Sequence, residues 1–108
     1  MAKNRTQRNA MGIMLIRRIF DLYDCVDVKI TSEESIGIGG SKMETNVNMT
    51  FDGMNLVTQF KPTQVEYTLY TQQGYHDGKR KYSNTATETI QELVSVIVSH
   101  IKKDKAKW

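Results

Sequence analysis

The stretch between residues 42 and 60 constrains the fold of this chain more than any other part of the sequence. Apolar and polar residues alternate there on both sides of Asp52–Gly53, a pair typical of the two-residue type I′ turn of a β-hairpin. A two-residue turn fixes the pairing, so Phe51 is expected opposite Met54. This register places the apolar residues of both strands on one side of the ribbon, as a half-buried hairpin requires. The pattern therefore predicts an antiparallel sheet built around this hairpin.

Further strands are expected on both sides of the hairpin. Residues 25–31 and 65–70 alternate between apolar and polar side chains, which is the pattern of half-buried strands. The glycine-rich segment 32–41 is expected to be a loop or a hairpin connection. Asp77–Gly78 indicates another turn, which would add a short fifth strand near residues 79–82.

An amphipathic helix is expected over residues 6–23. Gly12 is a poor helix former, so the start of the helix is expected either before it or just after it. Ile19 widens the apolar stripe of this helix. The stripe itself has spacings of three and four and consists of Ile13, Ile16, Phe20 and Tyr23.

A second helix is expected over residues 86–102. Thr85 and Glu88 match the capping box of a helix N-terminus. The apolar stripe of this helix consists of Ile90, Leu93, Val94, Ile97 and Ile101.

These elements predict an α+β fold, a two-layer sandwich with the order α-β-β-β-β(-β)-α. The antiparallel meander sheet has four strands, or five, and carries the N- and C-terminal helices on one face. Residues 1–108 are expected to form a single domain, with flexible basic tails at 1–5 and 103–108. The face without helices is expected to be polar and scarcely charged, and to present Asn46, Asn48, Thr50, Asn55, Val57, Gln59, Gln64, Glu66, Thr68 and Tyr70.

Charge is segregated along the chain, although the net charge is only +3. Residues 1–18 hold five basic and no acidic residues, residues 21–70 hold three basic and eight acidic ones, and residues 71–108 hold seven basic and four acidic ones. Basic ends can contact phosphates. They can also attract the acidic middle of a neighbouring subunit, and a homo-oligomer is expected for that reason and because the chain is small.

The sequence argues against a membrane protein and against an exported one. Its longest apolar run, Ile13–Ile16, is far too short to span a bilayer. No secretory signal is recognised, and Cys25 is the only cysteine, so the expected compartment is the cytoplasm.

No catalytic, metal or cofactor site is expected. His76 and His100 are the only histidines, and they form no paired ligand motif with Cys25 or with acidic residues. The chain is therefore expected not to be an enzyme.

The segment from residue 72 to residue 84 is the first candidate for ligand binding. It is expected to be a loop in which three consecutive basic residues lie between two tyrosines. Cations can hold phosphates, and tyrosine rings can stack on nucleobases. The expected ligand-binding residues are Tyr75, His76, Lys79, Arg80, Lys81, Tyr82 and Asn84.

We therefore expect a small non-enzymatic protein that binds an anionic ligand, either nucleic acid or a nucleotide-like molecule. The polar face of the sheet is a second candidate surface for this role. The alternative is a protein-interaction module, an adaptor or an inhibitor of another protein, of the kind that phages and mobile elements encode. A solvated loop without a ligand is the plainest interpretation of the basic segment.

Overall fold

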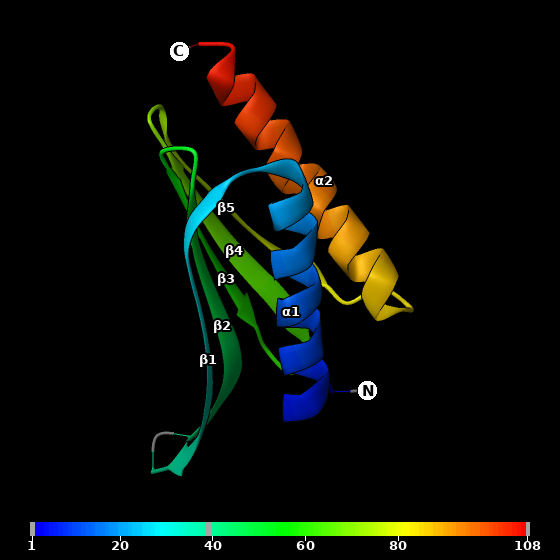
Figure 1. Ribbon diagram of the computed structural model, residues 1–108. Helices are drawn as coiled ribbons and strands as arrows, with labels where there is room; N and C mark the ends of the chain where they lie inside the picture. The colour runs from blue at the N-terminus through cyan, green and yellow to red at the C-terminus, as the bar shows by residue number, and fades with distance from the viewer. Residues whose placement is uncertain (1, 39, 108) are drawn as a thin grey trace.

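Two helices pack against one face of a single antiparallel sheet (Figure 1). The computed structural model describes residues 2–38 and 40–107. Helix α1 (Arg5–Leu22) precedes the sheet and α2 (Ala86–Lys105) follows it. The strands pair in chain order, so the predicted meander and its two-layer α+β architecture are confirmed, with five strands. They are β1 (Cys25–Gly37), β2 (Gly40–Phe51), β3 (Met54–Phe60), β4 (Gln64–Thr71) and β5 (Gly74–Lys81).

The central hairpin, β2 and β3, has the predicted turn and register. Asp52 and Gly53 have φ angles of 53° and 75°, the left-handed values that a type I′ turn requires at both positions. Phe51 lies opposite Met54, and the same register continues to Thr45 opposite Phe60. The turn pair thus fixes which side chains of both strands reach the core.

The first hairpin is longer than the sequence indicates. Segment 32–41, expected to be a loop or a hairpin connection, is strand for most of its length. Ser32 pairs with Thr45, and Gly37 pairs with Gly40. Strand β1 ends at Gly37 and β2 begins at Gly40, and residue 39 lies outside the described residues. Ladder hydrogen bonds to β2 satisfy the backbone here, and they outweigh the weak strand propensity of this polar stretch.

The predicted turn at Asp77–Gly78 is wrong. The chain turns at Gln72–Gln73 instead, and β5 runs unbroken from Gly74 to Lys81. Gly78 lies opposite Tyr67, where a Cβ atom would be 2.7 Å from the tyrosine Oη. The glycine is therefore explained by the space that this ring occupies.

Helix α1 begins before Gly12, at a capping box formed by Asn4 and Gln7. The Asn4 side chain accepts a hydrogen bond from the Gln7 backbone N–H at 2.9 Å, and the Gln7 side chain accepts one from the Asn4 N–H at 2.9 Å. This reciprocal pair satisfies two backbone donors that a helix start leaves free. The expectation that the helix could start after Gly12 is therefore wrong.

The buried face of α1 differs from the predicted stripe. Ile13 and Phe20 are 47% and 51% exposed, whereas Ile16 and Tyr23 are half-buried. A Cβ atom on Gly12 would lie 3.0 Å from side-chain atoms of both Ile30 and Val47, so the helix rests on the sheet through its glycine side. The buried residues of α1 are Arg8, Met11, Gly12, Leu15 and Ile19.

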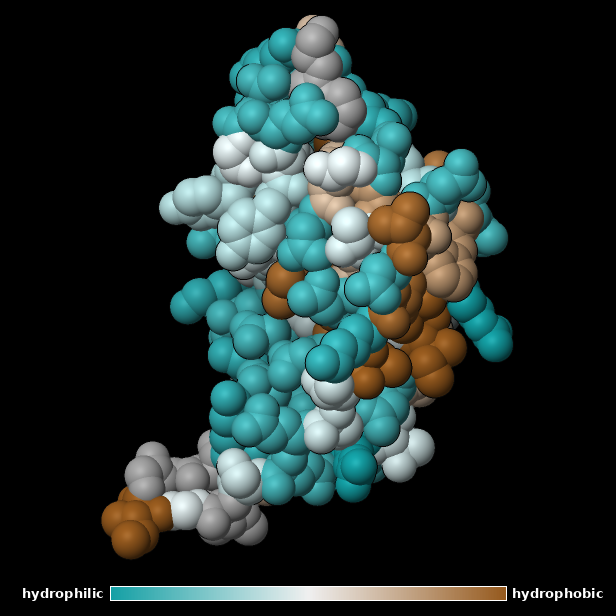
Figure 2. Space-filling model, turned by 60° about the vertical axis from the view of Figure 1, so that its left-hand side comes forward, coloured by the Kyte–Doolittle hydropathy of each residue, from teal (hydrophilic) through white to brown (hydrophobic). Residues whose placement is uncertain are grey.

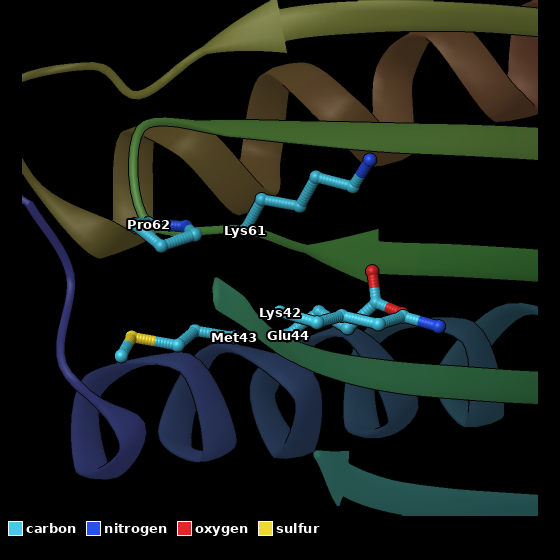
Figure 3. A pocket seen from close by; sticks show the side chains of 5 residues that line it. All are labelled: Lys42, Met43, Glu44, Lys61 and Pro62. Atoms are coloured by element: carbon cyan, nitrogen blue, oxygen red, sulfur yellow. The ribbon is translucent and has the colours of Figure 1, made fainter. Parts of the chain in front are cut away.

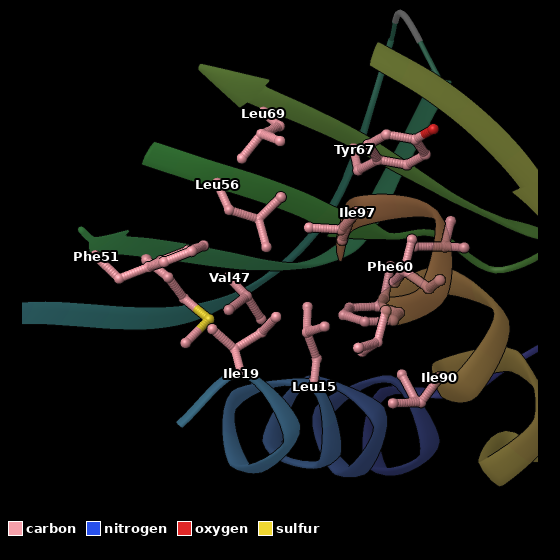
Figure 4. Packing of buried hydrophobic residues seen from close by; sticks show 14 of the residues in the cluster. Leu15, Ile19, Val47, Phe51, Leu56, Phe60, Tyr67, Leu69, Ile90 and Ile97 are labelled. Atoms are coloured by element: carbon pink, nitrogen blue, oxygen red, sulfur yellow. The ribbon is translucent and has the colours of Figure 1, made fainter. Parts of the chain in front are cut away.

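Helix α2 follows the prediction closely. Its N-cap, Thr85, accepts a hydrogen bond from the Glu88 N–H at 3.1 Å, and all five residues of its predicted stripe are buried. Figure 4 shows Ile90 and Ile97 of α2 beside Leu15 of α1, all facing the sheet. Both helices thus contribute to one hydrophobic core on one face of the sheet.

Parts of the expected tails belong to helices. Arg5 begins α1, and residues 103–105 end α2. The Lys3 backbone N–H donates a hydrogen bond to the Pro62 carbonyl at 2.7 Å. Met1 and Trp108 lie outside the described residues. Neither helix within ranges 2–38 and 40–107 has the length and apolarity needed to cross a membrane.

Candidate functional site

The basic segment lies on the edge strand β5 and not on a loop. Its side chains therefore alternate between the two faces of the sheet. His76 and Arg80 face the helices, because they lie opposite the buried Leu69 and Val65. The opposite, helix-free surface is called the open face below, and it receives the β5 side chains of Tyr75, Asp77, Lys79 and Lys81. The three consecutive basic residues, Lys79, Arg80 and Lys81, therefore do not form a single basic patch.

Arg80 is held by helix α2. Its Nη2 lies 3.1 Å from the Glu92 carboxylate, and the Ser83 hydroxyl donates to the same carboxylate oxygen at 2.8 Å. These hydrogen bonds, from Ser83 first and Arg80 second, lower the pKa of Glu92. Arg80 therefore connects β5 to α2 and is not free for a ligand.

Tyr82 and Asn84 follow the last residue of β5 and do not belong to the strand. The Tyr82 hydroxyl donates to the Lys61 carbonyl at 2.6 Å, and burial raises the pKa of this tyrosine to about 12. The Lys3 ammonium lies 5.5 Å from the centre of its ring. Asn84 is exposed between β5 and α2. Tyr82 thus secures the N-terminal segment.

His76 joins a polar cluster at the C-terminal end of α2. Its Nε2 lies 2.7 Å from Oδ2 of Asp104, and the Thr71 hydroxyl donates to the same oxygen at 2.7 Å. The ring stacks on that of His100, with centroids 4.3 Å apart and planes 12° apart. The hydrogen bonds from Thr71 and His76 lower the pKa of Asp104, and burial lowers the pKa of His100. This cluster attaches the end of α2 to β4 and β5.

Two exposed tyrosines lie side by side on the open face. Tyr70 of β4 is paired directly with Tyr75 of β5. Their ring centroids are 6.3 Å apart, with the planes tilted by 43°. Tyr70 is 49% exposed and Tyr75 is 65% exposed, although buried or half-buried positions are usual for such large rings. We call Tyr70 and Tyr75 the tyrosine pair.

A shallow depression lies next to the tyrosine pair. Its volume is about 170 Å³. Thr68 and Asp77 are each two residues from a member of the pair and share its face of the sheet. Open-face side chains supply most of the lining, namely Gln59, Glu66, Thr68, Asp77 and Lys79, and Tyr67 and Gly78 complete it. The depression offers the cationic donor of Lys79 and the carboxylate acceptors of Glu66 and Asp77.

A larger depression of about 260 Å³ lies where β2 begins and β3 ends (Figure 3). Its cations already have acidic neighbours: Lys42 lies 3.5 Å from both Glu33 and Glu44, and Lys61 lies 2.7 Å from Glu66. Glu33 first and Glu44 second raise the pKa of Lys42. Both lysines of this depression are therefore already engaged by carboxylates.

The amides of the open face are partly ordered by contacts among themselves. Asn55 donates hydrogen bonds to the Asn48 side chain at 2.7 Å, to the Thr50 hydroxyl at 3.3 Å and to the Met49 carbonyl at 3.1 Å. The network lies on β2 and β3, beside the strands that carry the tyrosine pair. These fixed dipoles give the open face a polar surface without high net charge.

Metal and thiol chemistry have little support in the part of the chain that the structure describes. No group of three His, Cys, Asp or Glu side chains there could hold a metal ion. Burial, with a smaller contribution from Asp24, raises the pKa of the Cys25 thiol, which disfavours the reactive thiolate.

Of the predicted ligand residues, the structure groups Tyr75, Lys79 and Lys81 on the open face and separates His76, Arg80, Tyr82 and Asn84 from them. Tyr70 was expected on the polar face but not in the ligand site. Its pairing with Tyr75 depends on the turn at residues 72–73, whereas the sequence pattern predicts a turn at Asp77–Gly78. No protein-family model matches this chain, and neither does any curated protein or solved structure.

Proposed function

We propose that this protein binds single-stranded nucleic acid on its open face, with the tyrosine pair as the platform on which bases stack. The observation that carries the proposal is the exposure of Tyr70 and Tyr75, two adjacent rings on a face of the sheet that is mostly polar. A base stacked on a tyrosine contributes about 1–3 kcal/mol, whatever its identity. Bases are free to stack in this way only when they are not paired in a duplex.

The surroundings of the pair supply complementary contacts for a nucleotide. Lys79 and Lys81 are exposed on the same face of β5 and could neutralise phosphates. Asp77 and Gln59, which line the adjacent depression, could accept hydrogen bonds from base amino groups. A free nucleotide would use the same contacts with fewer phosphates, and would therefore bind more weakly.

The test is fluorescence anisotropy with a labelled single strand of about 12 nucleotides, as DNA and as RNA. The double variant Tyr70→Ala/Tyr75→Ala is expected to lose at least about thirtyfold in affinity, since each of the two rings contributes about 1–3 kcal/mol. The double variant Tyr70→Phe/Tyr75→Phe keeps the rings and is expected to bind as the natural protein does.

Charge and strandedness provide the controls. Lys79→Ala/Lys81→Ala is expected to weaken binding, whereas Lys102→Ala/Lys103→Ala, with the same charge loss on α2, is not. With two phosphates neutralised, affinity for a single strand should fall about sevenfold between 50 and 200 mM salt. Equal binding of the Tyr→Ala variant, or equal affinity for a duplex of the same sequence, would contradict the proposal.

A protein-interaction function is the second candidate. Exposed apolar side chains on α1 and β1, among them Ile13, Phe20 and Val26, favour it, because contiguous apolar surface marks interaction sites. Recovery of one stoichiometric partner protein, insensitive to nuclease, would support this candidate. It also requires that the surface is free in the purified protein.

A further inference from the structure

Exposed apolar side chains run along α1 and β1, at the far edge of the sheet from the tyrosine pair. Ile13 and Phe20 of α1 are 47% and 51% exposed, and Val26 and Ile30 of β1 are 79% and 40% exposed. Figure 2 shows hydrophobic side chains gathered along one flank of the molecule. We call Ile13, Phe20, Val26 and Ile30 the α1–β1 patch.

The helix and the strand form one continuous surface because they approach closely. A Cβ atom on Gly12 would be 3.0 Å from the Ile30 side chain, so α1 rests directly beside β1. Ile16 of α1 and Val28 of β1 are half-buried and pack against the same core. The patch is therefore one surface and not a scatter of single residues.

Strand β1 is also an edge of the sheet. It pairs with β2 on one side, and no other described strand lies on its other side. An edge strand presents a row of backbone N–H and C=O groups that can pair with another chain. At 13 residues, β1 is the longest strand of the sheet, so the row is long.

We propose that the α1–β1 patch and the free edge of β1 bind a second copy of this chain. The two β1 strands pair antiparallel about a twofold axis, which continues the sheet from one copy into the other. The two α1 helices then lie on the same face of the joined sheet and cover each other's apolar side chains. Such a twofold interface uses the same surface on both copies.

Charge selects the register of this pairing. With Val28 on the twofold axis, Asp27 of each copy lies opposite Lys29 of the other, and the strand is regular over these residues, since its one irregularity falls between Cys25 and Asp27. Asp27 and Lys29 are both exposed on β1, and opposite charges in a cross-strand pair are favourable. An axis through Lys29 would oppose two lysines, and an axis through Asp27 would oppose two aspartates. Of the axes through these three neighbouring residues, only the one through Val28 places opposite charges against each other.

The area is sufficient for a dimer. The exposed fractions of the four patch residues amount to about 400 Å² of apolar surface per copy, within the range of the largest patch on a typical monomer. The β1 backbone and the polar side chains around the patch would extend this toward the roughly 800 Å² per partner of a standard stable interface.

The test is the mass in solution by analytical ultracentrifugation, over protein concentrations from about 1 to 500 µM because association depends on concentration. The natural protein is expected to reach twice 12.4 kDa. Asp27→Lys and Lys29→Asp, made singly, oppose like charges across the axis and are expected to weaken dimerisation at least about tenfold, since each creates two unfavourable pairs. The double variant Asp27→Lys/Lys29→Asp restores opposite charges and is expected to restore the dimer.

Folding and specificity have their own controls. Both positions are exposed, so circular dichroism should be unchanged in each variant. Lys79→Asp makes the same change of charge on β5 and should leave the mass unaltered. A monomer at every concentration overturns the proposal and leaves the patch to a different protein. A dimer that both single variants retain overturns it too. Tyr70→Ala/Tyr75→Ala should still dimerise, so this result is independent of nucleic-acid binding.

Discussion

Two neighbouring residues of β3 test which face of the sheet is covered by the helices and which is open to solvent. Leu56 is fully buried between the equally buried Met49 and Leu69 on the adjacent strands, whereas Val57 is half-buried on the open face. The substitutions Leu56→Ala and Val57→Ala therefore remove apolar groups from opposite sides of the same strand. The fold predicts very different costs for the two.

The magnitudes follow from burial. A fully buried Leu→Ala substitution costs about 2–5 kcal/mol, and the tightly packed neighbours of Leu56 leave little room for collapse, so about 3–4 kcal/mol is expected. Val57→Ala loses only partly buried methyl groups and some strand propensity, about 1 kcal/mol at most. For a chain of this length, each kcal/mol corresponds to about 4 °C in Tm. The expected decreases are therefore about 12–16 °C for Leu56→Ala and at most about 4 °C for Val57→Ala.

The assay is urea and thermal unfolding followed by far-ultraviolet circular dichroism. Equal m-values for both variants and the natural protein would show that the free energies are comparable. If Val57→Ala cost as much as Leu56→Ala, the open face would have to be covered, and the assignment of the two faces would be wrong.

Three further outcomes are expected. Gly53→Ala should cost about 1–2 kcal/mol in urea unfolding, because Gly53 has φ of 75° and an L side chain is strained there; an unchanged midpoint would contradict the turn type. Burial and the neighbouring His76 lower the pKa of His100 in the folded protein. The unfolded chain therefore binds more protons than the folded protein, and the free energy of unfolding should fall as the pH drops below about 6.5. The variant His100→Phe keeps a ring beside His76 but cannot titrate, so urea unfolding at several pH values should show a smaller loss. Asp104→Asn should lower the urea midpoint at neutral pH, because the carboxylate accepts hydrogen bonds from Thr71 and His76; a midpoint equal to that of the natural protein would mean that this cluster does not stabilise the fold.

The central hairpin and α2 were predictable because their signals are local. Asp52–Gly53 determines a turn type, and the turn determines the register of every pair that follows. The stripe of α2 is the only apolar side of that helix, so its buried face has no competitor. Local chemistry and tertiary packing agree in both elements.

The buried face of α1 was not predictable in the same way. The helix carries one apolar set at Ile13, Ile16 and Phe20 and another at Met11, Leu15 and Ile19. Both have helical spacing, and hydrophobicity alone does not choose between them. The choice depends on Gly12, which allows close approach to Ile30 and Val47, a contact distant in sequence.

The candidate site was missed in part for a similar reason. The composition of residues 72–84 indicated bases and tyrosines, but the alternation of a strand sends Lys79 and Arg80 to opposite faces. The misplaced turn at Asp77–Gly78 concealed both this alternation and the pairing of Tyr70 with Tyr75. Gly78 is needed because the Tyr67 ring leaves no room for a side chain opposite it. In the sequence, a glycine required for this reason looks the same as a glycine required by a turn.

The most direct test of a recognition surface on the open face is an NMR titration of the tyrosine ring signals with an unlabelled single-stranded oligonucleotide. The ring signals of Tyr70 and Tyr75 should shift strongly and saturate together, because bases stack on them. Those of Tyr23, at the C-terminal end of α1, and of Tyr82, beyond the end of β5, should remain nearly unchanged. Shifts confined to Tyr82, or no shifts at millimolar oligonucleotide, would contradict the assignment of recognition to the helix-free face of the sheet.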